Sequence, residues 1–353
     1  MTNQFDISEF GAVGDGKTDC TAAIQQALDK AGETRGCVLV PPGTYATGRL
    51  TLRAHSRMEG KSAWSFREDG ASVLKLNAPG AGCLLDITGA YGSTISGICL
   101  DGGGLGENTH GVYLYWEKYN GGGQEDTPAI EDCRIGKFTG NGVHLEHIWC
   151  FSLRHSMLQG NHGAGLFIDG WDGFIIDNWF TGNKRGGILG GSCAASLTLT
   201  GNRVEWNGGG GFLFPHGRAM NITGNYFDRS FGPALRGGTA ENGYFSDSAV
   251  TGNFFNRSGC PDHQRFASPY ENSHVFLTRA GNVTLTGNSF CAGENDGGGG
   301  TRSPDYGIVV QNSDAVIVQA NTLRHGALKE NIFWDGKGDC LVKDNLGRKE
   351  LPL

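Results

Sequence analysis

The sequence lacks the long apolar runs and the excess of positive charge that several large classes of protein require. No stretch approaches the roughly 18 consecutive apolar residues of a membrane-spanning helix, so no membrane partner is expected. The formal charge is −7, from 29 Lys and Arg against 36 Asp and Glu. Phosphate binding needs concentrated cations, so this balance argues against a nucleic-acid partner. It also disfavours a strongly anionic ligand, unless a local basic patch reverses the balance.

A targeting signal and paired cysteines are also missing. The N-terminus, MTNQFDISEFGAVGDG, has no basic segment followed by an apolar run, so we expect no signal peptide. The chain would then be either cytoplasmic or the mature form of a secreted protein. The ten cysteines occur singly, without a CxxC pair, which favours small buried hydrophobes over a zinc site or a disulfide framework. We therefore expect neither a metal nor a cofactor.

What the sequence does contain is a repeat, clearest between Gly140 and Arg236. Each copy has a Gly-Asn or Asp-Asn marker, a short alternating run, a turn and a second short run. Runs such as 196–200 (SLTLT) alternate with period two, which is typical of strands, and helical spacing is absent. A period of this length is the signature of a repeat architecture. The marker recurs in steps of 23 to 35 residues at His155, Asn178, Asn202, Asn225, Asn253, Asn288, Asn321 and Asn345.

These runs are too short to bury a core alone and do not carry hairpin turns throughout, so the chain must coil. Each run would pair in parallel with its copy one period later, which predicts an all-β fold, a right-handed parallel β-helix. The recurring Asn would form a buried amide ladder between coils, and the 60 glycines would serve the turns. We expect one domain over 1–353, with coils over 61–348 and a short tail at 349–353.

Residues 1–60 differ from the repeats. An amphipathic helix is predicted over 21–30, and a strand that ends in Pro-Pro-Gly follows it. A helix here would act as a cap on the open end of the coil. The motifs FGAVGDGKTD and VPPGTY resemble the N-terminal signature of the pectate-lyase-like right-handed parallel β-helix superfamily, which includes polygalacturonase-like hydrolases, uronate epimerases, fructotransferases and phage tailspikes. The resemblance implies an oligo- or polysaccharide partner and a possible homotrimer.

Candidate catalytic residues come from aligning the strand that follows each Gly-Asn. Its second and fourth residues are mostly apolar and should point inward, so the fifth should face out. Glu146 and Asp169 are consecutive acids at that position, about 4.8 Å apart at the backbone if the coils are in register. Neighbouring carboxylates push one pKa up, which suits glycoside cleavage. The full fifth-position column is Tyr115, Glu146, Asp169, Gly191, Pro215, Arg236, Gln311 and Asp335.

Other residues complete the predicted site. Asp172 and His216 are further catalytic candidates, and aromatic rings and cations near the pair are expected to bind the sugar. The alternative interpretation is that these acids are solvated surface residues of a solenoid. The predicted substrate-binding residues are Tyr115, His144, His147, Trp149, Trp171, Arg218 and Arg236.

Three functions follow from these observations. The first is an enzyme that cleaves or transfers glycosidic bonds of a mostly neutral glycan, for which the acid pair and the aromatic residues argue. The second is a polysaccharide lyase or uronate C5-epimerase with His216 or a Tyr as base and Arg218 or Arg236 against the uronate. The third is a non-catalytic glycan-binding or tailspike-like module. The polygalacturonase motifs Asn-Thr-Asp and Gly-His-Gly are absent, and the alginate-epimerase-like motif has only a partial echo at 211–216, where Phe214 replaces its acid.

Overall fold

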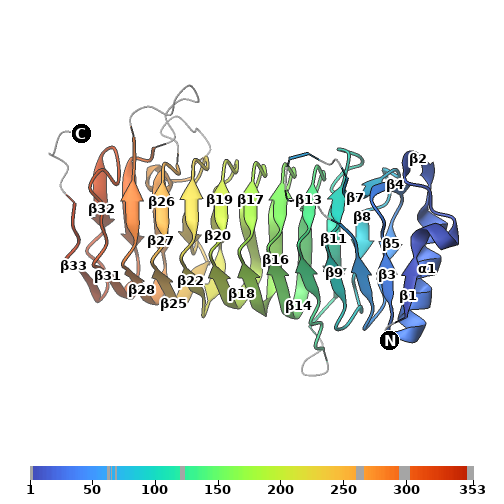
Figure 1. The fold of residues 1–353 in the computed structure, drawn as a ribbon. Helices are drawn as coiled ribbons and strands as arrows, with labels where there is room; N and C mark the ends of the chain where they lie inside the picture. Colours follow the sequence, from blue (N-terminus) through green and yellow to red (C-terminus); the bar gives the residue numbers. More distant parts are fainter. Residues whose placement is uncertain are drawn as a thin grey trace. The chain divides into compact units, whose positions relative to one another are not determined.

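The computed structural model describes residues 3–61, 64, 66–67, 70–119, 124–259, 266–293 and 303–347. Short parallel strands dominate it, and they coil as a right-handed parallel β-helix, which confirms the predicted fold (Figure 1). The chain divides into two compact units, Met1–Trp179 and Phe180–Leu353. One domain over 1–353 stays a prediction, and the predicted tail at 349–353 lies outside the described residues.

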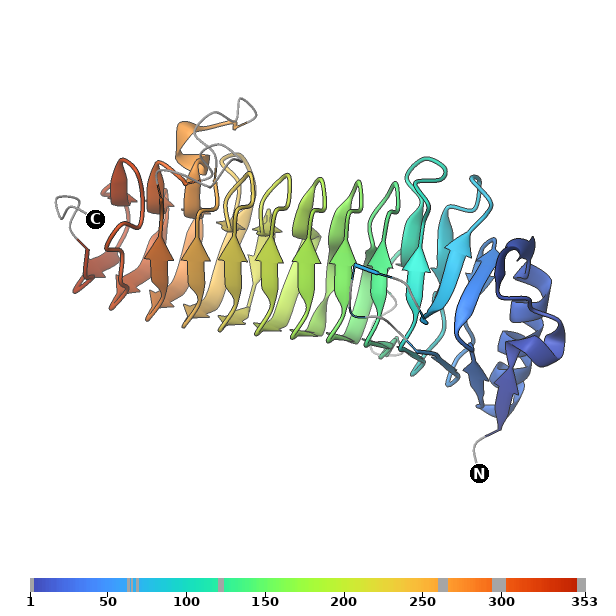
Figure 2. The same cartoon turned by 45° about the horizontal axis from the view of Figure 1, so that its top comes forward.

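The first unit begins with helix α1 (Thr21–Thr34), which extends one turn beyond the predicted 21–30. The Asp19 carboxylate accepts a hydrogen bond from the backbone N of Thr21 at 3.0 Å, where the helix starts. Ile24 and Leu28 are buried on its inner face, and the helix lies against β1 and β3, as Figure 2 shows. The predicted cap is therefore present at this end of the first unit.

Each coil of the first unit contributes strands to three parallel stacks. One stack runs β2–β4–β7–β10–β13–β15, a second β3–β6–β9–β12–β14, and a third β5–β8–β11–β14–β16. The elements are β1 (Gln4–Asp6), η1 (Ile7–Phe10), β2 (Asp15–Asp19), β3 (Cys37–Leu39), β4 (Gly43–Thr47), β5 (Leu50–Thr51), β6 (Arg57–Glu59), β7 (Ser72–Leu76), β8 (Cys83–Asp86), β9 (Thr94–Ser96), β10 (Cys99–Asp101), β11 (His110–Tyr115), β12 (Ala129–Glu131), β13 (Arg134–Gly136), β14 (Val143–Arg154), β15 (Met157–Gln159), β16 (Ala164–Ile176) and β17 (Trp179–Thr181), which begins at the unit boundary.

The second unit repeats this scheme. Its stacks run β19–β23–β26–β29, β20–β24–β27–β30–β32 and β22–β25–β28–β31–β33. The elements are β18 (Gly186–Thr200), β19 (Arg203–Glu205), β20 (Phe212–Phe214), β21 (His216–Arg218), β22 (Asn221–Thr223), β23 (Tyr226–Asp228), β24 (Leu235–Gly237), β25 (Tyr244–Thr251), β26 (Phe254–Asn256), η3 (Pro269–Glu271), β27 (Ser273–Thr278), β28 (Ala280–Thr286), β29 (Ser289–Cys291), β30 (Tyr306–Gln311), β31 (Asp314–Gln319), β32 (Glu330–Trp334) and β33 (Cys340–Lys343).

The core is made of side chains that stack on their copies in the next coil. Phe227, Phe255 and Phe290 occupy matching positions of three successive strands, and their ring centroids are 4.9 and 4.7 Å apart. Of the predicted buried cysteines, Cys83, Cys99 and Cys133 are buried, whereas Cys150 and Cys193 are half-buried. Burial raises the pKa of Cys83 and Cys133 to about 12, so both side chains behave as small hydrophobes.

The predicted asparagine ladder is present. In the second unit the Nδ2 of Asn202 donates to the Oδ1 of Asn225 at 2.9 Å, and Asn225 donates in the same way to Asn253. Asn253, Asn288 and Asn321 continue the series to Asn345 at 2.9–3.0 Å. Each Oδ1 also accepts from the backbone N of the Asn before it, so the coils from Asn202 to Asn321 are each joined to the next by at least two buried hydrogen bonds.

One marker of the ladder was assigned wrongly. His155 is half-exposed and its side chain contacts Asp177 and Trp64. The ladder position in that coil belongs instead to Ser156, whose backbone N donates to Asn178 Oδ1 at 3.0 Å and whose Oγ accepts from the backbone N of Cys133. The coil is therefore one residue out of phase with the sequence alignment.

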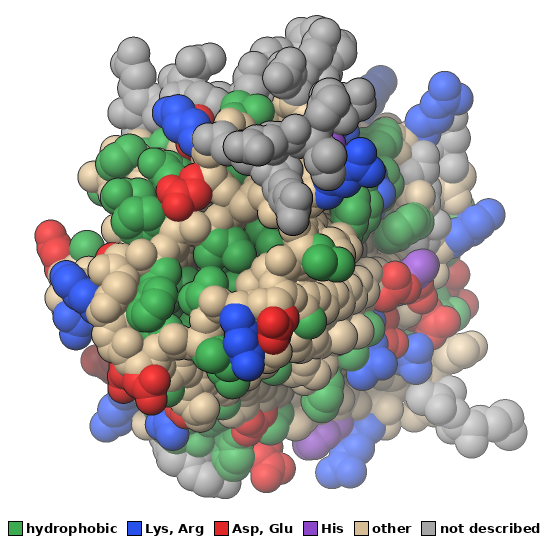
Figure 3. Space-filling model, turned by 90° about the vertical axis from the view of Figure 1, so that its left-hand side faces the viewer, with side chains coloured by type: hydrophobic (Ala, Val, Ile, Leu, Met, Phe, Trp, Pro, Cys, Tyr) green, Lys and Arg blue, Asp and Glu red, His purple; other side chains and the backbone are tan. Residues whose placement is uncertain are grey.

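The last coil of the second unit ends in β32 and β33. Hydrophobic side chains are visible on this end of the unit (Figure 3), where Trp334, Leu341 and Leu346 are exposed. Among the residues that the structure describes, no helix is long and apolar enough to cross a membrane.

A buried histidine in β27 makes the stability of the second unit depend on pH. His274 is fully buried near Phe255 and Phe290, and burial lowers its pKa to about 3. The unfolded chain takes up this proton near pH 6.5, so the stabilisation is complete above that pH and is lost as the pH falls toward 3. On acidification from pH 7 to pH 5, the free energy of unfolding of the wild type is expected to fall by about 2 kcal/mol more than that of the His274→Phe variant.

Urea unfolding at the two pH values measures this difference. Phenylalanine fits the aromatic surroundings, and the Cys291 carbonyl that faces His274 Nε2 also accepts from the backbone N of Arg257. His162 is exposed, so His162→Gln should keep the wild-type pH dependence. If His274→Phe loses as much stability on acidification as the wild type, the histidine is not the acid-sensitive group.

Candidate active site

The predicted acid pair is in register. Glu146 on β14 is the direct partner of Asp169 on β16, and Tyr115 on β11 is the partner of Glu146. Leu145 and Ile168, which directly precede Glu146 and Asp169, are fully buried. Because side chains alternate along a strand, the two acids lie on the outer side of this wall. The Glu146 side chain is 31% exposed, whereas Asp169 is only 6% exposed. Asp169 is thus not the solvated surface acid of the alternative interpretation.

A histidine positions Glu146. The Nε2 of His144 lies 3.1 Å from Glu146 Oε2, and its Nδ1 lies 2.9 Å from the amide nitrogen of Asn141. The amide nitrogen is a donor, so the assigned arrangement leaves Nδ1 as the acceptor and lets Nε2–H donate to the carboxylate. Burial lowers the pKa of His144, and its contact with Glu146 opposes that shift. His144 is therefore a fixed, neutral donor to Glu146 at neutral pH.

A β-bulge follows Glu146. The register shifts between Glu146 and Ile148, so His147 is an extra residue without a partner on β16, and its φ is 57°. Cys150 also has a positive φ, of 59°, so β14 bends twice within four residues. Bulges of this kind re-aim side chains and are frequent beside active sites. The bend separates the wall that carries Glu146 from the segment that carries Trp149.

Aromatic rings form a column beside the acid pair. The rings of Tyr113, His144 and Phe167 occupy matching positions in three coils, with centroids 5.2 and 4.6 Å apart. Tyr115 stacks on Tyr113 at 6.3 Å and is exposed, so it can offer its face to a sugar ring. Burial raises the pKa of Tyr113, and the charge of Glu146 raises it further.

A cation beside this column is already paired with an acid. Arg49 forms an ion pair of 2.5 Å with Asp86, the register partner of Tyr113. Among the described residues, Glu146 pairs with His144 and not with a lysine or arginine.

The predicted tryptophans form a separate cluster beyond the bend. Trp149 and Trp171 are register partners, and the Nε1 of Trp149 donates to Asp172 Oδ2 at 2.6 Å. Tyr119 packs on Trp171 with a centroid distance of 4.5 Å. Asp172 also lines a mostly apolar cavity of about 260 Å³. Asp172 thus holds Trp149 in place, and His147 hydrogen-bonds the carbonyl of Trp116 through Nδ1 at 2.7 Å.

The three predicted site residues of the second unit do not form one group. His216 and Arg218 lie on β21, where His216 packs against Tyr244 and Arg218 forms an ion pair with Asp247. Arg236 lies on β24, in a different strand stack, and pairs with a buried glutamate. Its register partner is Leu213 and not Pro215, so its place in the fifth-position column was wrong by two residues.

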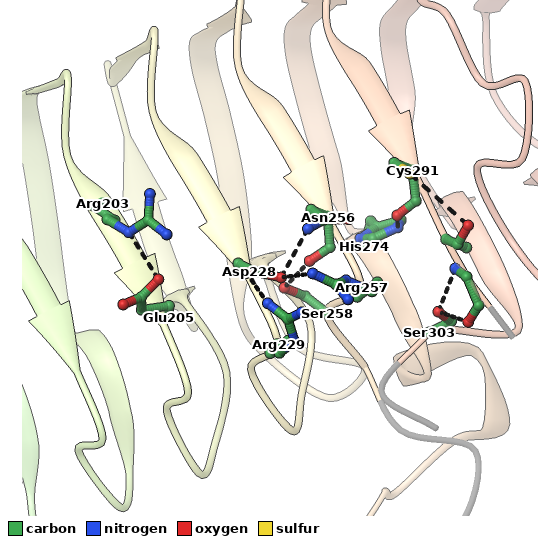
Figure 4. Close-up of polar contacts among 12 residues, drawn as sticks. Arg203, Glu205, Asp228, Arg229, Asn256, Arg257, Ser258, His274, Cys291 and Ser303 are labelled. Atoms are coloured by element: carbon green, nitrogen blue, oxygen red, sulfur yellow. Dashed lines mark hydrogen bonds and ion pairs between the residues drawn. The ribbon is translucent and has the colours of Figure 1, made fainter. Parts of the chain in front are cut away.

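A second stacked acid pair was not predicted from the sequence. Glu205 and Asp228 are register partners on β19 and β23 and are 6% and 3% exposed. Figure 4 shows Asp228 surrounded by Arg229, Arg257 and Asn256, and Glu205 bound to Arg203. Burial raises the pKa of Asp228, and the two arginines oppose that shift.

The signal for this second pair was in the sequence. Glu205 and Asp228 each follow a ladder asparagine by three residues, as do Asn256 and Cys291. Both acids pair with arginines, Glu205 with Arg203 of its own strand and Asp228 with Arg229 and with Arg257 of the next coil, whereas Glu146 is held by a histidine. Among the described residues, no group of three or more His, Cys, Asp or Glu side chains is arranged to hold a metal ion.

Two family models match the chain. The model described as a right handed beta helix region matches residues 141–323. The model described as rhamnogalacturonase A/epimerase, pectate lyase-like, matches residues 4–66.

Individual relatives extend this comparison. The chain is 29% identical over 238 residues to mannuronan C5-epimerase AlgE2 of Azotobacter vinelandii, which covers 60% of this chain and 23% of that protein. It is 23% identical over 262 residues to a probable glucan endo-1,3-beta-glucosidase of Arthroderma benhamiae, covering 65% of this chain and 27% of that protein. The chain thus spans less than a third of the length of these relatives.

A solved structure has the same fold. The A-module of mannuronan C-5 epimerase AlgE4 from Azotobacter vinelandii superimposes with a TM-score of 0.68, over 99% of this chain and 98% of that one, at 18% identity. The first family model covers more than half of the chain. With its N-terminal signature matched by the second, the chain belongs to the right-handed β-helix family, in the pectate-lyase-like superfamily.

Proposed function

We propose that this protein is a carbohydrate-active enzyme that cleaves or transfers a glycosidic bond of a mostly neutral glycan, with Glu146 and Asp169 as its carboxylate pair. The observation that carries the proposal is their direct register on adjacent strands. Glycoside cleavage uses one carboxyl group as the proton donor to the leaving oxygen and a second as base or nucleophile. The chain's relatives include a protein named as a glucosidase and proteins named as epimerases, all of which act on sugars.

The geometry favours distinct roles for the two acids. Glu146 accepts a hydrogen bond from the neutral His144, which fixes the direction of its carboxylate and suits a nucleophile. Asp169 is the more buried of the two and would donate the proton to the leaving oxygen. The exposed ring of Tyr115 would support the sugar next to the bond that breaks.

The strand spacing also predicts the stereochemistry. Neighbouring strands lie about 4.8 Å apart at the backbone, and a similar distance between the two carboxyl groups would match the roughly 5–5.5 Å of retaining glycosidases. Inverting enzymes need about 6.5–9.5 Å to admit a water molecule. The pair would therefore form a glycosyl–enzyme intermediate, which either water or a second sugar hydroxyl can resolve, with net retention of configuration.

A panel of plant and microbial glycans with product analysis by mass spectrometry tests the proposal. Hydrolysis adds the mass of one water, intermolecular transfer gives new oligomers, and NMR of the fresh product reads the anomeric configuration. Inverted product contradicts the nucleophile role of Glu146. If the protein binds a glycan of the panel but releases no product, the chain is a binding module.

A second candidate is a lyase or uronate C5-epimerase, which the match to mannuronan C5-epimerases favours. The structure offers it His144 and Tyr113 as adjacent proton carriers, with ring centroids 5.2 Å apart. Arg49 would have to leave Asp86 to neutralise the uronate. A lyase would release unsaturated uronate, which absorbs ultraviolet light, and an epimerase would change the sugar composition without a change in mass.

A further inference from the structure

A cleft in the second unit carries a charge opposite to that of the whole chain. It has a volume of about 280 Å³. The described residues that line it include three cations, Lys184, Arg185 and Arg236, against one acid, Glu271. The local formal charge is therefore positive, although the chain carries −7. We refer to this site as the Arg236 cleft.

Two glycines of the cleft lining let the chain pack closely against Lys184 and Arg185. A Cβ atom at Gly209 would lie 1.9 Å from the carbonyl oxygen of Arg185, and one at Gly208 would lie 2.4 Å from that of Lys184. The backbone of the turn before β20 therefore packs directly against the backbone of Lys184 and Arg185. Their backbones are fixed in this way while their side chains remain exposed at the rim.

Arg236 has hydrogen-bonding capacity to spare. Its Nη2 lies 3.5 Å from Glu271 Oε1, and its Nε has no hydrogen-bond partner among the described residues. A guanidinium group has five N–H donors arranged as a fork that matches carboxylates and other planar or tetrahedral oxyanions. Glu271, at the end of η3, is buried; burial raises its pKa, and Arg236 opposes that shift. One buried carboxyl thus offsets only part of the cationic lining.

The rest of the lining is apolar. Leu213, Phe231, Pro233 and Phe266 line the cleft together with the glycines. Aromatic and aliphatic side chains suit the C–H faces of a sugar ring, whereas a small inorganic anion would gain nothing from them. The volume is at the lower end of the roughly 300–1,000 Å³ of small-molecule sites, which fits one sugar residue and not an oligomer.

We propose that the Arg236 cleft binds a single anionic sugar residue. Its carboxylate or sulfate group would lie against Arg236, Lys184 and Arg185, and its ring against Phe231 and Phe266. The site is separate from the residues assigned to bond cleavage, and the proposal does not depend on Glu146 or Asp169 being catalytic. It means that a glycan recognised by the second unit carries an acidic substituent.

Isothermal titration of the full chain with D-glucuronic acid, glucose 6-sulfate and glucose tests this assignment. Both acidic sugars are expected to bind more tightly than glucose and to weaken as salt is added, because the rim cations are exposed. The tighter of the two identifies the preferred anion. Arg236→Gln should weaken binding by at least about tenfold, since it removes a charge-assisted hydrogen bond.

Three further variants make the result decisive. The double variant Lys184→Gln/Arg185→Gln changes only exposed rim side chains, so it tests the cleft even if Arg236→Gln folds poorly. Arg218→Gln removes an exposed arginine elsewhere and should bind as the wild type does. Glu146→Gln should also keep full binding, which distinguishes a failure of this site from a failure of the proposed catalysis. Equal affinity for glucose, no binding of either acidic sugar, or unchanged binding by both cleft variants would overturn the proposal.

Discussion

Replacing Glu146 with glutamine is expected to lower turnover of the glycan substrate by about 10²–10⁴-fold. Glutamine keeps the size of the side chain and can still accept the hydrogen bond from His144 Nε2, which lies 3.1 Å from the carboxylate. An amide can serve neither as a base nor as a nucleophile, so only the chemical step is lost. The initial rate of product formation, measured by mass spectrometry on the substrate found in the screen, gives the effect.

Its controls separate chemistry from folding. Glu107→Gln makes the same change at an exposed position of the first unit and should leave the rate unchanged. Asp169→Asn should cause a loss comparable to that of Glu146→Gln. Thermal unfolding of each variant shows whether the coil is intact. Full activity in a folded Glu146→Gln protein would remove the carboxylate pair from the mechanism.

Removing one amide from the asparagine ladder should have the largest effect on stability. Asn225 is 1% exposed; its Oδ1 accepts from the backbone N and the Nδ2 of Asn202, and its own Nδ2 donates to Leu199 O and Asn253 Oδ1. Asn225→Ala leaves several of these buried groups without a partner, at about 1–3 kcal/mol each. We expect the free energy of unfolding to fall by about 3–5 kcal/mol in total.

Urea titration measures this loss. Asn345→Ala is the matched control, because it makes the same change at the last, half-buried member of the ladder, where water can replace the lost bonds. Its cost should be about 1 kcal/mol. Similar losses for the two variants would mean that burial does not set the strength of the ladder.

The periodicity of the sequence was sufficient for the fold and for the acid pair. A fixed spacing between Asn markers places Glu146 and Asp169 at the same point of successive coils, and the structure confirms their register. The burial of Asp169 could not be predicted, because it depends on side chains from other coils. The roles of these residues in catalysis stay a prediction.

The choice of reference residue explains the main error. Counting from the glycine that opens each strand aligned Gly232 with Gly211, but the backbone N of Phe212 donates to Ala234 O, so Gly211 corresponds to Ala234. Arg236 therefore moves from the level of Pro215 to that of Leu213, which lies 23 residues earlier, the same step that separates Asn202 from Asn225. Counting from the ladder asparagine instead of the glycine gives the correct register. The stacking of Glu205 on Asp228 was not predicted for a different reason, since only the strand after the Gly-Asn was aligned and not the strand after the ladder asparagine.

The number of residues in a coil does not affect the spacing between the ladder asparagines of neighbouring coils. Asn225 and Asn253 are 28 residues apart and Asn253 and Asn288 are 35 apart, yet their amide contacts measure 2.9 and 3.0 Å. The additional residues lie in the segments between strands, so they do not change the spacing of the stacked strands. Turns of this protein can therefore vary in length and sequence while the ladder keeps its geometry. A new binding loop placed between two ladder asparagines would be held by a rigid support.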